Sequence, residues 1–252
     1  MRYDIQRAGM MKRIAAWVLD AILFFTLLVG AFTGFSALFK LDNRALEMHQ
    51  IYETYQETYK IDFTISPEAY EKLTEAEKQV YEDAQKALAE DPKAKKAYED
   101  FLYGTLAMVT LSFLVTYLIL EFGVPLLLKN GQTVGKKVFS LALMRTDGIK
   151  VSTFMLFVRA IIGKYTLETM VPVAILVMLL FGTVGTLGLI IIGLILLLQI
   201  VILVKTRNNS VIHDLLACTV VVDYSSQMIF DTPEALHEYE ERLREDFESR
   251  AD

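Results

Sequence analysis

The stretch that decides the fold runs from Met11 to Phe39 and has the sequence MKRIAAWVLDAILFFTLLVGAFTGFSALF. From Ala21 to Phe39 it contains no charged residue. About 20 apolar residues in a helix cross the roughly 30 Å hydrocarbon core of a bilayer. A secretory signal peptide is the alternative, but its apolar core extends for only about 7 to 15 residues. Residues 1–39 therefore predict a short N-terminal segment and a transmembrane helix that stays in the protein.

Two charges stand near the start of this helix. Arg13 and Asp20 are seven residues apart, which is about two helical turns, so both project from the same face. A charge that faces lipid costs a few kcal/mol, so this face should turn toward protein or water. For Arg13 two interpretations stay open, an anchor at the cytoplasmic headgroups or a member of a buried site. Asp20 lies deeper and is a candidate functional residue that needs a partner.

The composition also indicates a membrane protein. The chain has 252 residues, of which 54% are hydrophobic, and its mean hydropathy is +0.37. Its single cysteine, Cys218, excludes an internal disulfide framework, and three histidines offer few metal ligands. We therefore expect contact with the lipid bilayer, and we expect no metal site, no cofactor, no nucleic acid partner and no enzymatic activity.

Residues 40–100 differ from the apolar runs. From Leu41 to Asp100 there are fifteen acidic and eight basic residues, and few basic residues near the membrane are typical of an extracytoplasmic loop. Serine followed by proline at Ser66-Pro67 indicates a helix start, and Pro92 restarts a helix. We expect an acidic helical insertion over the outer surface, where an envelope or membrane protein partner could bind.

A second transmembrane helix is predicted over residues 101–128. It contains Glu121 and, near its inner end, Pro125, which removes a backbone hydrogen bond and can kink the helix. Glu121 has two interpretations. It is either a carboxylate at the membrane interface or a second buried carboxylate available to Arg13 or Arg159.

The next segment, residues 129–165, is basic. It has seven basic residues and one acidic residue up to Lys164, which predicts a cytoplasmic position. The pattern indicates a β-hairpin with strands at 138–144 and 149–151. Residues 154–162 then predict an interfacial helix that carries Arg159 toward the membrane surface.

Part of this basic segment resembles a phosphate-binding loop. Residues 131–136 have the sequence GQTVGK. A Walker motif requires a glycine where Asn130 stands and a serine or threonine where Lys137 stands. The motif fails at both positions, so we expect no nucleotide site here.

Residues 166–204 predict a transmembrane hairpin. Two apolar runs, Thr166–Phe181 and Leu187–Val204, are separated by residues 182–186, whose sequence GTVGT is typical of a tight outer turn. One very long helix is the alternative. With a hairpin the chain has four transmembrane helices, and both termini lie in the cytoplasm.

The C-terminal part contains a histidine–aspartate pair. His213 and Asp214 lie in the segment 205–223, which is too short to span the bilayer and ends in a β-type run from Thr219. No serine or cysteine stands at a spacing that suggests a catalytic triad. The acidic tail, residues 224–252, predicts a cytoplasmic helix that begins at Thr232-Pro233-Glu234.

Three features taken together resemble the RDD family of bacterial membrane proteins, which is named for one arginine and two aspartates. They are the charges of the first helix, the stretch from Gly131 to Lys136, and the pair His213-Asp214 before the β-type run. The resemblance implies that Arg13, Asp20 and Asp214 are the family's three residues. Arg159 and the Asp147-Gly148 turn also resemble recurring family features. The resemblance covers the first helix and roughly residues 101–223, and it leaves out the insertion and the acidic tail.

The resemblance implies two functions. Some relatives are associated with cation/proton exchange, and others are accessory or regulatory membrane proteins. We predict an all-α membrane protein of the bacterial inner membrane with four transmembrane helices, a small cytoplasmic β element and a helical extracytoplasmic insertion. As a cation/proton antiporter, it would be a homo-oligomer in which Asp20 alternates between proton and cation. Arg13 and Asp214 would then adjust the Asp20 charge and hold a closed inner gate by ion pairing, with Glu121, Arg159 and His213 in support. The alternative is a non-transporting scaffold or regulator whose insertion binds a partner protein.

Overall fold

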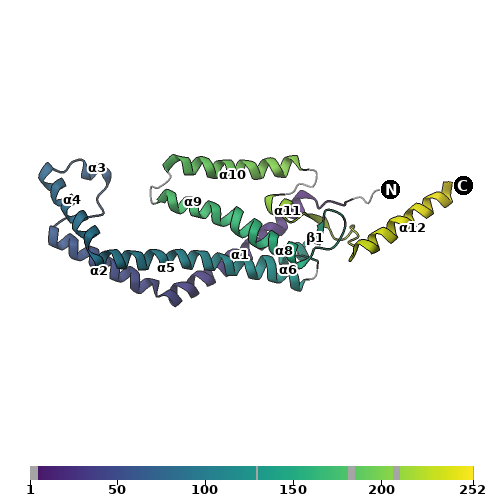
Figure 1. Ribbon diagram of the computed structural model, residues 1–252, viewed down its shortest axis with the longest axis horizontal. Coiled ribbons are helices and arrows are strands. Elements are labelled where there is room, and N and C mark those ends of the chain that lie inside the picture. Colours follow the sequence, from purple (N-terminus) through teal and green to yellow (C-terminus); the bar gives the residue numbers. More distant parts are fainter. Residues whose placement is uncertain (1–4, 129, 181–184, 207–210, 252) are drawn as a thin grey trace. The chain divides into compact units, whose positions relative to one another are not determined.

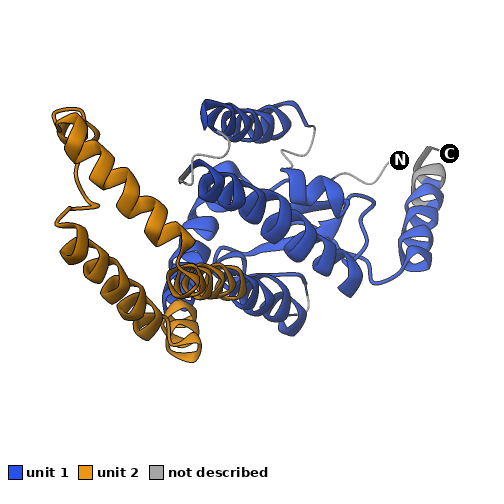
Figure 2. Ribbon diagram, turned by 60° about the vertical axis from the view of Figure 1, so that its left-hand side comes forward, with its two compact units in different colours: residues 1–29, 113–252 blue, residues 30–112 orange. Residues whose placement is uncertain are grey.

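The computed structural model describes residues 5–128, 130–180, 185–206 and 211–251 (Figure 1). Within these ranges four helices are long and apolar enough to cross a membrane, as predicted. Their bounds are Met10–Phe39, Pro92–Leu127, Thr153–Leu179 and Gly185–Lys205. The chain is therefore an all-α membrane protein. It divides into two compact units, residues 30–112 and residues 1–29 with 113–252 (Figure 2).

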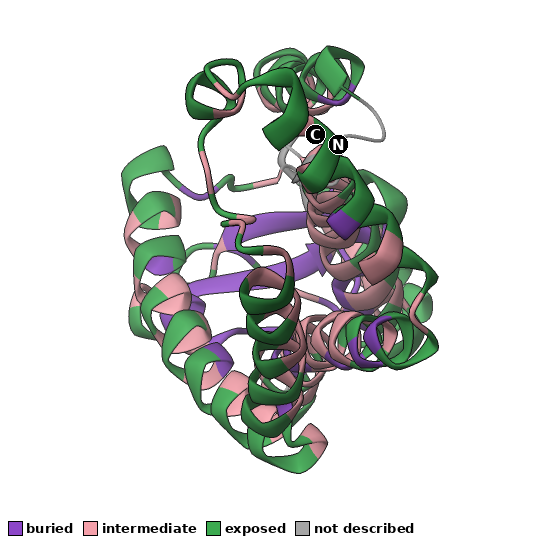
Figure 3. Cartoon of the chain, turned by 90° about the vertical axis from the view of Figure 1, so that its left-hand side faces the viewer, coloured by how far each residue is buried: buried purple, intermediate pink, exposed green. Residues whose placement is uncertain are grey.

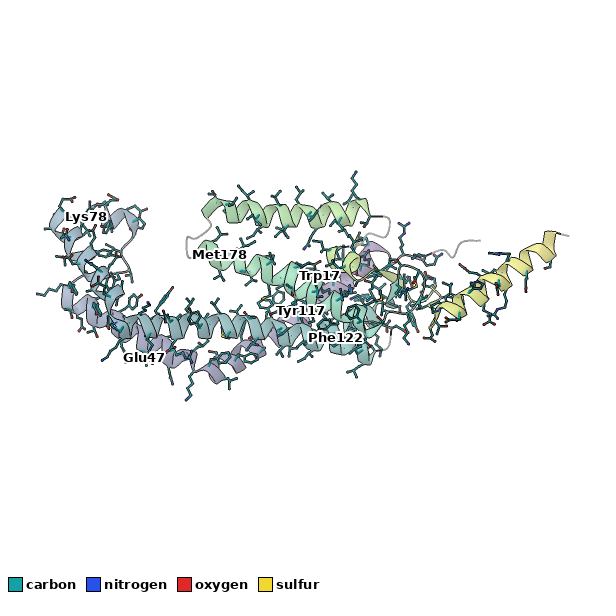
Figure 4. The ribbon with its side chains drawn as sticks, in the orientation of Figure 1. Trp17, Glu47, Lys78, Tyr117, Phe122 and Met178 are labelled. Carbon is teal, nitrogen blue, oxygen red and sulfur yellow. The ribbon has the colours of Figure 1, made fainter. Side chains whose placement is uncertain are left out.

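The first two spans belong partly to each unit. The first is α1 (Met10–Phe39), and the second joins α5 (Pro92–Tyr117), the π-helical segment η1 (Leu118–Gly123) and α6 (Val124–Leu127). Pro125 explains the wide turn of η1, because it has no backbone N–H and its ring would clash with the carbonyl four residues earlier. In this segment Phe122, which is labelled in Figure 4, packs edge-on against Phe157, with 5.9 Å between ring centroids.

The third span is longer than predicted. It runs without a break through α8 (Thr153–Phe157), the π-helical segment η2 (Val158–Met170) and α9 (Val171–Leu180). A separate interfacial helix at 154–162 is therefore wrong. Lys164 and Glu168 interrupt the apolar run in the sequence, but both side chains find partners inside the protein, so the helix continues.

The fourth span, α10 (Gly185–Lys205), packs against α9 (Figure 1). The two runs thus form a hairpin and not one long helix. Residues 182–184 of the predicted turn, with Phe181 at the end of the first run, lie outside the described residues.

A two-stranded antiparallel sheet lies in the same unit as the third and fourth spans. Its strands are β1 (Leu141–Arg145) and β2 (Thr219–Asp223), with Leu143 opposite Val221. Both strands are buried along nearly their whole length (Figure 3). The predicted hairpin is reduced to one bridge, Met144 to Lys150. Because β1 is apolar on both faces, it pairs best with another apolar strand. β2 is a longer apolar strand than residues 149–151, so β1 pairs with β2.

Two short helices, α7 (Val134–Val138) and α11 (Ile212–Leu216), pack against the sheet, and the 19-residue helix α12 (Pro233–Ala251) follows it in the chain. The last begins where the tail sequence predicted, and the Thr232 hydroxyl caps it by accepting from the Ala235 N–H at 3.2 Å. Short bridges extend the sheet on both sides, from Arg7 to Val222 and from Phe230 to Ile149.

The unit formed by residues 30–112 contains the acidic insertion, which is helical as predicted. Its helices are α2 (Leu41–Tyr59), α3 (Pro67–Tyr70), α4 (Glu75–Glu90) and the start of α5. Ser66 caps α3, and Thr74 and Glu77 form a capping box at α4. Edge-on ring contacts hold these helices together, joining Phe63 to Tyr52 and Tyr81, and Tyr81 to Tyr70.

Candidate functional site

Asp20 of α1 binds the N-terminus of α7. One carboxylate oxygen accepts a hydrogen bond from the Thr133 hydroxyl at 2.5 Å, and the other accepts from the Gly135 backbone N–H at 2.7 Å. A helix N-terminus leaves backbone N–H groups without partners, so it suits a carboxylate. The stretch that resembles a phosphate loop therefore holds an aspartate of the same chain.

Gly135 makes this contact possible. A Cβ at this position would overlap the Ala16 carbonyl group and would lie 2.9 Å from the carboxyl carbon of Asp20. Real Cβ atoms do not come so close, so any other residue would separate α7 from α1. The glycine allows the backbone N–H to reach the Asp20 carboxylate.

Arg159 and Asp214 form a buried ion pair. The Arg159 Nε lies 2.9 Å from an Asp214 oxygen, and the side chains of the two residues are 5% and 2% exposed. The Thr219 hydroxyl donates to the same Asp214 oxygen at 3.1 Å. Although burial alone would raise the pKa of Asp214, the positive charge of Arg159 holds it well below its usual range.

His213 lies between Arg159 and Glu168. Its Nε2 is 3.0 Å from a terminal nitrogen of Arg159, and its Nδ1 is 2.8 Å from a Glu168 oxygen. Because a guanidinium can only donate, Nε2 must accept and Nδ1 must carry the proton that Glu168 receives. This arrangement holds the imidazole neutral, and burial correspondingly lowers the pKa of His213.

Glu121 is a buried carboxylate, so the second of its two interpretations applies. Its Oε2 is 2.6 Å from the Lys164 Nζ and 3.9 Å from an Arg159 nitrogen. Lys164 was not identified from the sequence, which offered Arg13 or Arg159 as the partner. The structure assigns the close contact to Lys164.

The π-helical geometry of η2 brings its charged side chains to one face. The Val171 N–H bonds to the Thr166 carbonyl, five residues earlier, so each turn takes up roughly one residue more than in an α-helix. In an α-helix, Lys164 and Glu168 would project about 140° and 180° away from Arg159. A helical period of 3.6 residues therefore could not have identified Lys164 and Glu168 as site residues.

Gly163 positions α11 on this face. A Cβ at Gly163 would lie 2.5 Å from the His213 Cβ and 2.8 Å from its Cα. The glycine lets α11 pack directly on η2, and this close packing places His213 and Asp214 beside Arg159.

These groups line one cavity of about 330 Å³. Its rim includes Trp17, which is 68% exposed and is labelled in Figure 4. Four cations, four carboxylates and the neutral imidazole face it, so the cavity is balanced in formal charge. They are Arg13 and Asp20 of α1, Glu121 of η1, Lys136 of α7, Arg159, Lys164 and Glu168 of η2, and His213 and Asp214 of α11.

The cavity has no resemblance to a metal centre. Within the described ranges, no group of three or more histidine, cysteine, aspartate and glutamate side chains could hold a metal ion. Its charged groups instead form pairs that extend from one helix to the next.

Lys136 is the third site residue, after Lys164 and Glu168, that was not identified from the sequence. It is 8% exposed, and its Nζ lies 3.2 Å from the Thr133 hydroxyl oxygen. Burial lowers the pKa of Lys136 to about 8, and Arg159 and Lys164 add to this effect by repulsion. A lysine with this pKa can gain or lose a proton near neutral pH.

Comparison with known families identifies the chain. The model of the RDD family matches residues 7–218. The chain belongs to the RDD family. Comparison with curated proteins and with solved structures gave no match.

Arg13, Asp20 and Asp214, the three residues that the resemblance implied, all line the cavity. The predicted pairing among them is different in the structure. Asp214 pairs with Arg159, and Asp20 binds Thr133 and Gly135. Among the described residues Arg13 forms no ion pair with either aspartate, because η2 and α7 supply nearer partners.

Proposed function

We propose that this RDD family membrane protein exchanges a monovalent cation for protons, with Asp20 as the carboxylate that receives the cation. The observation that carries the proposal is the nature of the Asp20 partners. Both are neutral groups, a hydroxyl and a backbone N–H, and within the described part of the chain Asp20 forms no ion pair. Its negative charge faces the cavity without a cation in contact.

The other three carboxylates of the cavity differ in this respect. Asp214 is paired with Arg159, Glu121 with Lys164, and Glu168 shares a proton with His213. A cation that bound at any of them would have to displace an existing partner. At Asp20 it would meet a carboxylate that no cation contacts within the described ranges, and carboxylate oxygens suit hard cations.

Arg13 and Asp214 have the gating role in this proposal. Arg13 faces the same cavity and forms no ion pair among the described residues, so its guanidinium can move toward or away from the carboxylates. When the cavity holds no cation, Arg13 supplies positive charge near Asp20 and Asp214. An arriving cation would repel it, which would open the cavity.

The proposal includes an orientation and an assembly. We place the protein in the bacterial inner membrane, with the sheet, α7 and both termini on the cytoplasmic side, because residues 129–165 are rich in lysine and arginine. Four spans leave little room for a pathway inside one chain. A homo-oligomer would supply the remaining walls.

Proton flux in proteoliposomes tests this function. The purified protein is reconstituted with a pH dye inside, and Na⁺, K⁺ or Li⁺ is added outside. We expect the wild type to move protons and Asp20→Asn to move none while it elutes as a folded protein. Asp147→Asn, at the half-exposed partner of Arg145, is the matched control and should behave as the wild type. Absence of flux with every cation in the folded wild type would refute the proposal.

A second candidate function is a non-transporting scaffold or regulator. Two closed ion pairs and the hydrogen bond between His213 and Glu168 are also what a purely structural network in one cavity would contain. In this case the insertion, residues 40–100, would bind an envelope or membrane protein. Asp20→Asn would then lower the amount of folded protein without any transport to lose, which separates the two candidates.

A further inference from the structure

Lys136 has no part in the exchange described so far. It directly follows Gly135, whose N–H binds Asp20. The Lys136 side chain is connected to Asp20 through one oxygen atom, the Thr133 Oγ1. Its Nζ is 3.2 Å from the Thr133 Oγ1, and that same oxygen is 2.5 Å from the Asp20 carboxylate. A buried ammonium and a cavity carboxylate thus share a single hydroxyl.

The hydrogen-bond roles in this chain are determined. A threonine hydroxyl has one proton to donate and two lone pairs that accept. The ammonium and the Lys136 backbone N–H can only donate, so both lone pairs accept from Lys136. The hydroxyl proton must then point to Asp20. The direction of donation runs from Lys136 through Thr133 to Asp20.

We propose that Lys136 carries the exchanged proton and that the Thr133 hydroxyl couples its charge to cation binding at Asp20. The inference rests on the proposed function and adds the identity of the proton carrier. In the proton-loaded state Lys136 is an ammonium and Asp20 holds no cation. In the cation-loaded state Lys136 is a neutral amine and the cation lies on the Asp20 carboxylate.

The formal charge of the cavity supports this coupling. Four cations balance four carboxylates, and His213 is held neutral by its contact with Arg159. A monovalent cation that entered would leave one excess positive charge in a cavity between helices, where charge is costly. Breaking one N–H bond of Lys136 restores the balance. The nitrogen keeps the electron pair, and the proton passes to water in the cavity.

Lys136 is better suited to this role than the other cations of the cavity. Arg13 and Arg159 have guanidinium groups, which do not lose a proton in proteins. Lys164 is fixed at 2.6 Å from Glu121, and a close carboxylate favours the ammonium form. Among the described residues Lys136 forms no ion pair.

The charged and titratable groups that line the cavity with Lys136 come from all the elements packed around it. They are Arg13 and Asp20 from α1, Glu121 from η1, Arg159, Lys164 and Glu168 from η2, and His213 and Asp214 from α11. Burial lowers the pKa of Lys136 to about 8, with repulsion from Arg159 and Lys164 in the same direction, whereas Glu121 and Asp20 oppose it. The amine can therefore release its proton when a cation adds one more positive charge.

Proton release on cation binding tests the inference. The full-length protein in detergent, weakly buffered, is titrated with NaCl, KCl and LiCl, and bound cation and released protons are both counted. With a carrier whose pKa is about 8, we expect about one proton per cation near pH 7, about half near pH 8 and almost none near pH 10. Lys136→Gln should bind the cation and release no proton. The exposed neighbour variant Lys137→Gln is the matched control and should release protons as the wild type does.

The outcomes separate the two proposals. If the wild type binds no cation, the exchange function is wrong and the carrier with it. If it binds a cation and Lys136→Gln still releases protons, the exchange stands and Lys136 is not the carrier. If Lys136→Gln does not fold, the pH dependence of proton release from the wild type still tests the inference. A carboxylate carrier would release protons only at acid pH, and that profile would overturn the inference.

Discussion

Replacing Gly135 by alanine tests whether the close approach of α7 to α1 holds the site together. The new Cβ would overlap the Ala16 carbonyl, so α7 must move away. The Asp20 carboxylate would lose its hydrogen bonds from Gly135 and Thr133. A hydrogen bond to a charged group contributes about 1.5–3 kcal/mol. Because Asp20 faces a cavity, water can form new hydrogen bonds to it and recover part of the lost energy. We therefore take the lower end of this range, about 1.5 kcal/mol for each bond and about 3 kcal/mol for the two.

A loss of this size is measurable as a thermal shift. For a chain of this length, 1 kcal/mol corresponds to roughly 2–4 °C, so Gly135→Ala should lower the unfolding midpoint in detergent by about 6–12 °C. Gly193→Ala in α10 is the matched control, because a Cβ there meets nothing within 4 Å. Equal midpoints for the two variants would refute the close-approach explanation.

Three further changes probe the same network. Arg159→Met leaves Asp214 buried without its cation and should lower the free energy of unfolding by about 3–5 kcal/mol. The control Arg145→Met removes a half-exposed ion pair and should change this free energy by less than about 1 kcal/mol. Equal losses of stability in the two variants would argue against a buried pair. Because the pKa of His213 is lowered from 6.5, the unfolded chain binds the proton more readily, and stability should fall as the pH decreases below about 6.5. His213→Gln should remove this slope in a pH series of unfolding midpoints, and the exposed His237→Gln should keep it; a slope that persists in His213→Gln would assign it to another group. Thr133→Val removes the shared hydroxyl and should abolish cation-driven proton flux, whereas Thr133→Ser should retain it; flux in the valine variant would exclude a role for the hydroxyl.

Much of the fold could be predicted because membrane spans depend on length and hydrophobicity, which the sequence displays directly. The helix starts at Ser66-Pro67 and Thr232-Pro233 were also predictable, since caps are local. The strand partner of residues 141–145 was not. Strand pairing is a long-range choice, and β2 lies more than seventy residues away in the sequence.

The site, like the fold, was predictable from the sequence only in part. Arg13, Asp20 and Asp214 were predicted to lie near one another, and all three line the cavity. Their actual partners depend on features that a regular helical period hides. The wide turns of η2 rotate Lys164 and Glu168 into the cavity, and a close helix approach at Gly135 turns a glycine-rich loop into the partner of Asp20.

The most direct test of exchange at Asp20 is to drive it with a proton gradient. Proteoliposomes are loaded at acid pH with Na⁺, K⁺ or Li⁺ and are diluted into a neutral medium that contains the same concentration of the same cation. The amount of cation inside the vesicles is then measured over time. We expect one of these cations to accumulate against its gradient with the wild type and with Asp147→Asn, and no cation to accumulate with Asp20→Asn. If no cation accumulates with the folded wild type, or if Asp20→Asn accumulates it equally, exchange at Asp20 is contradicted.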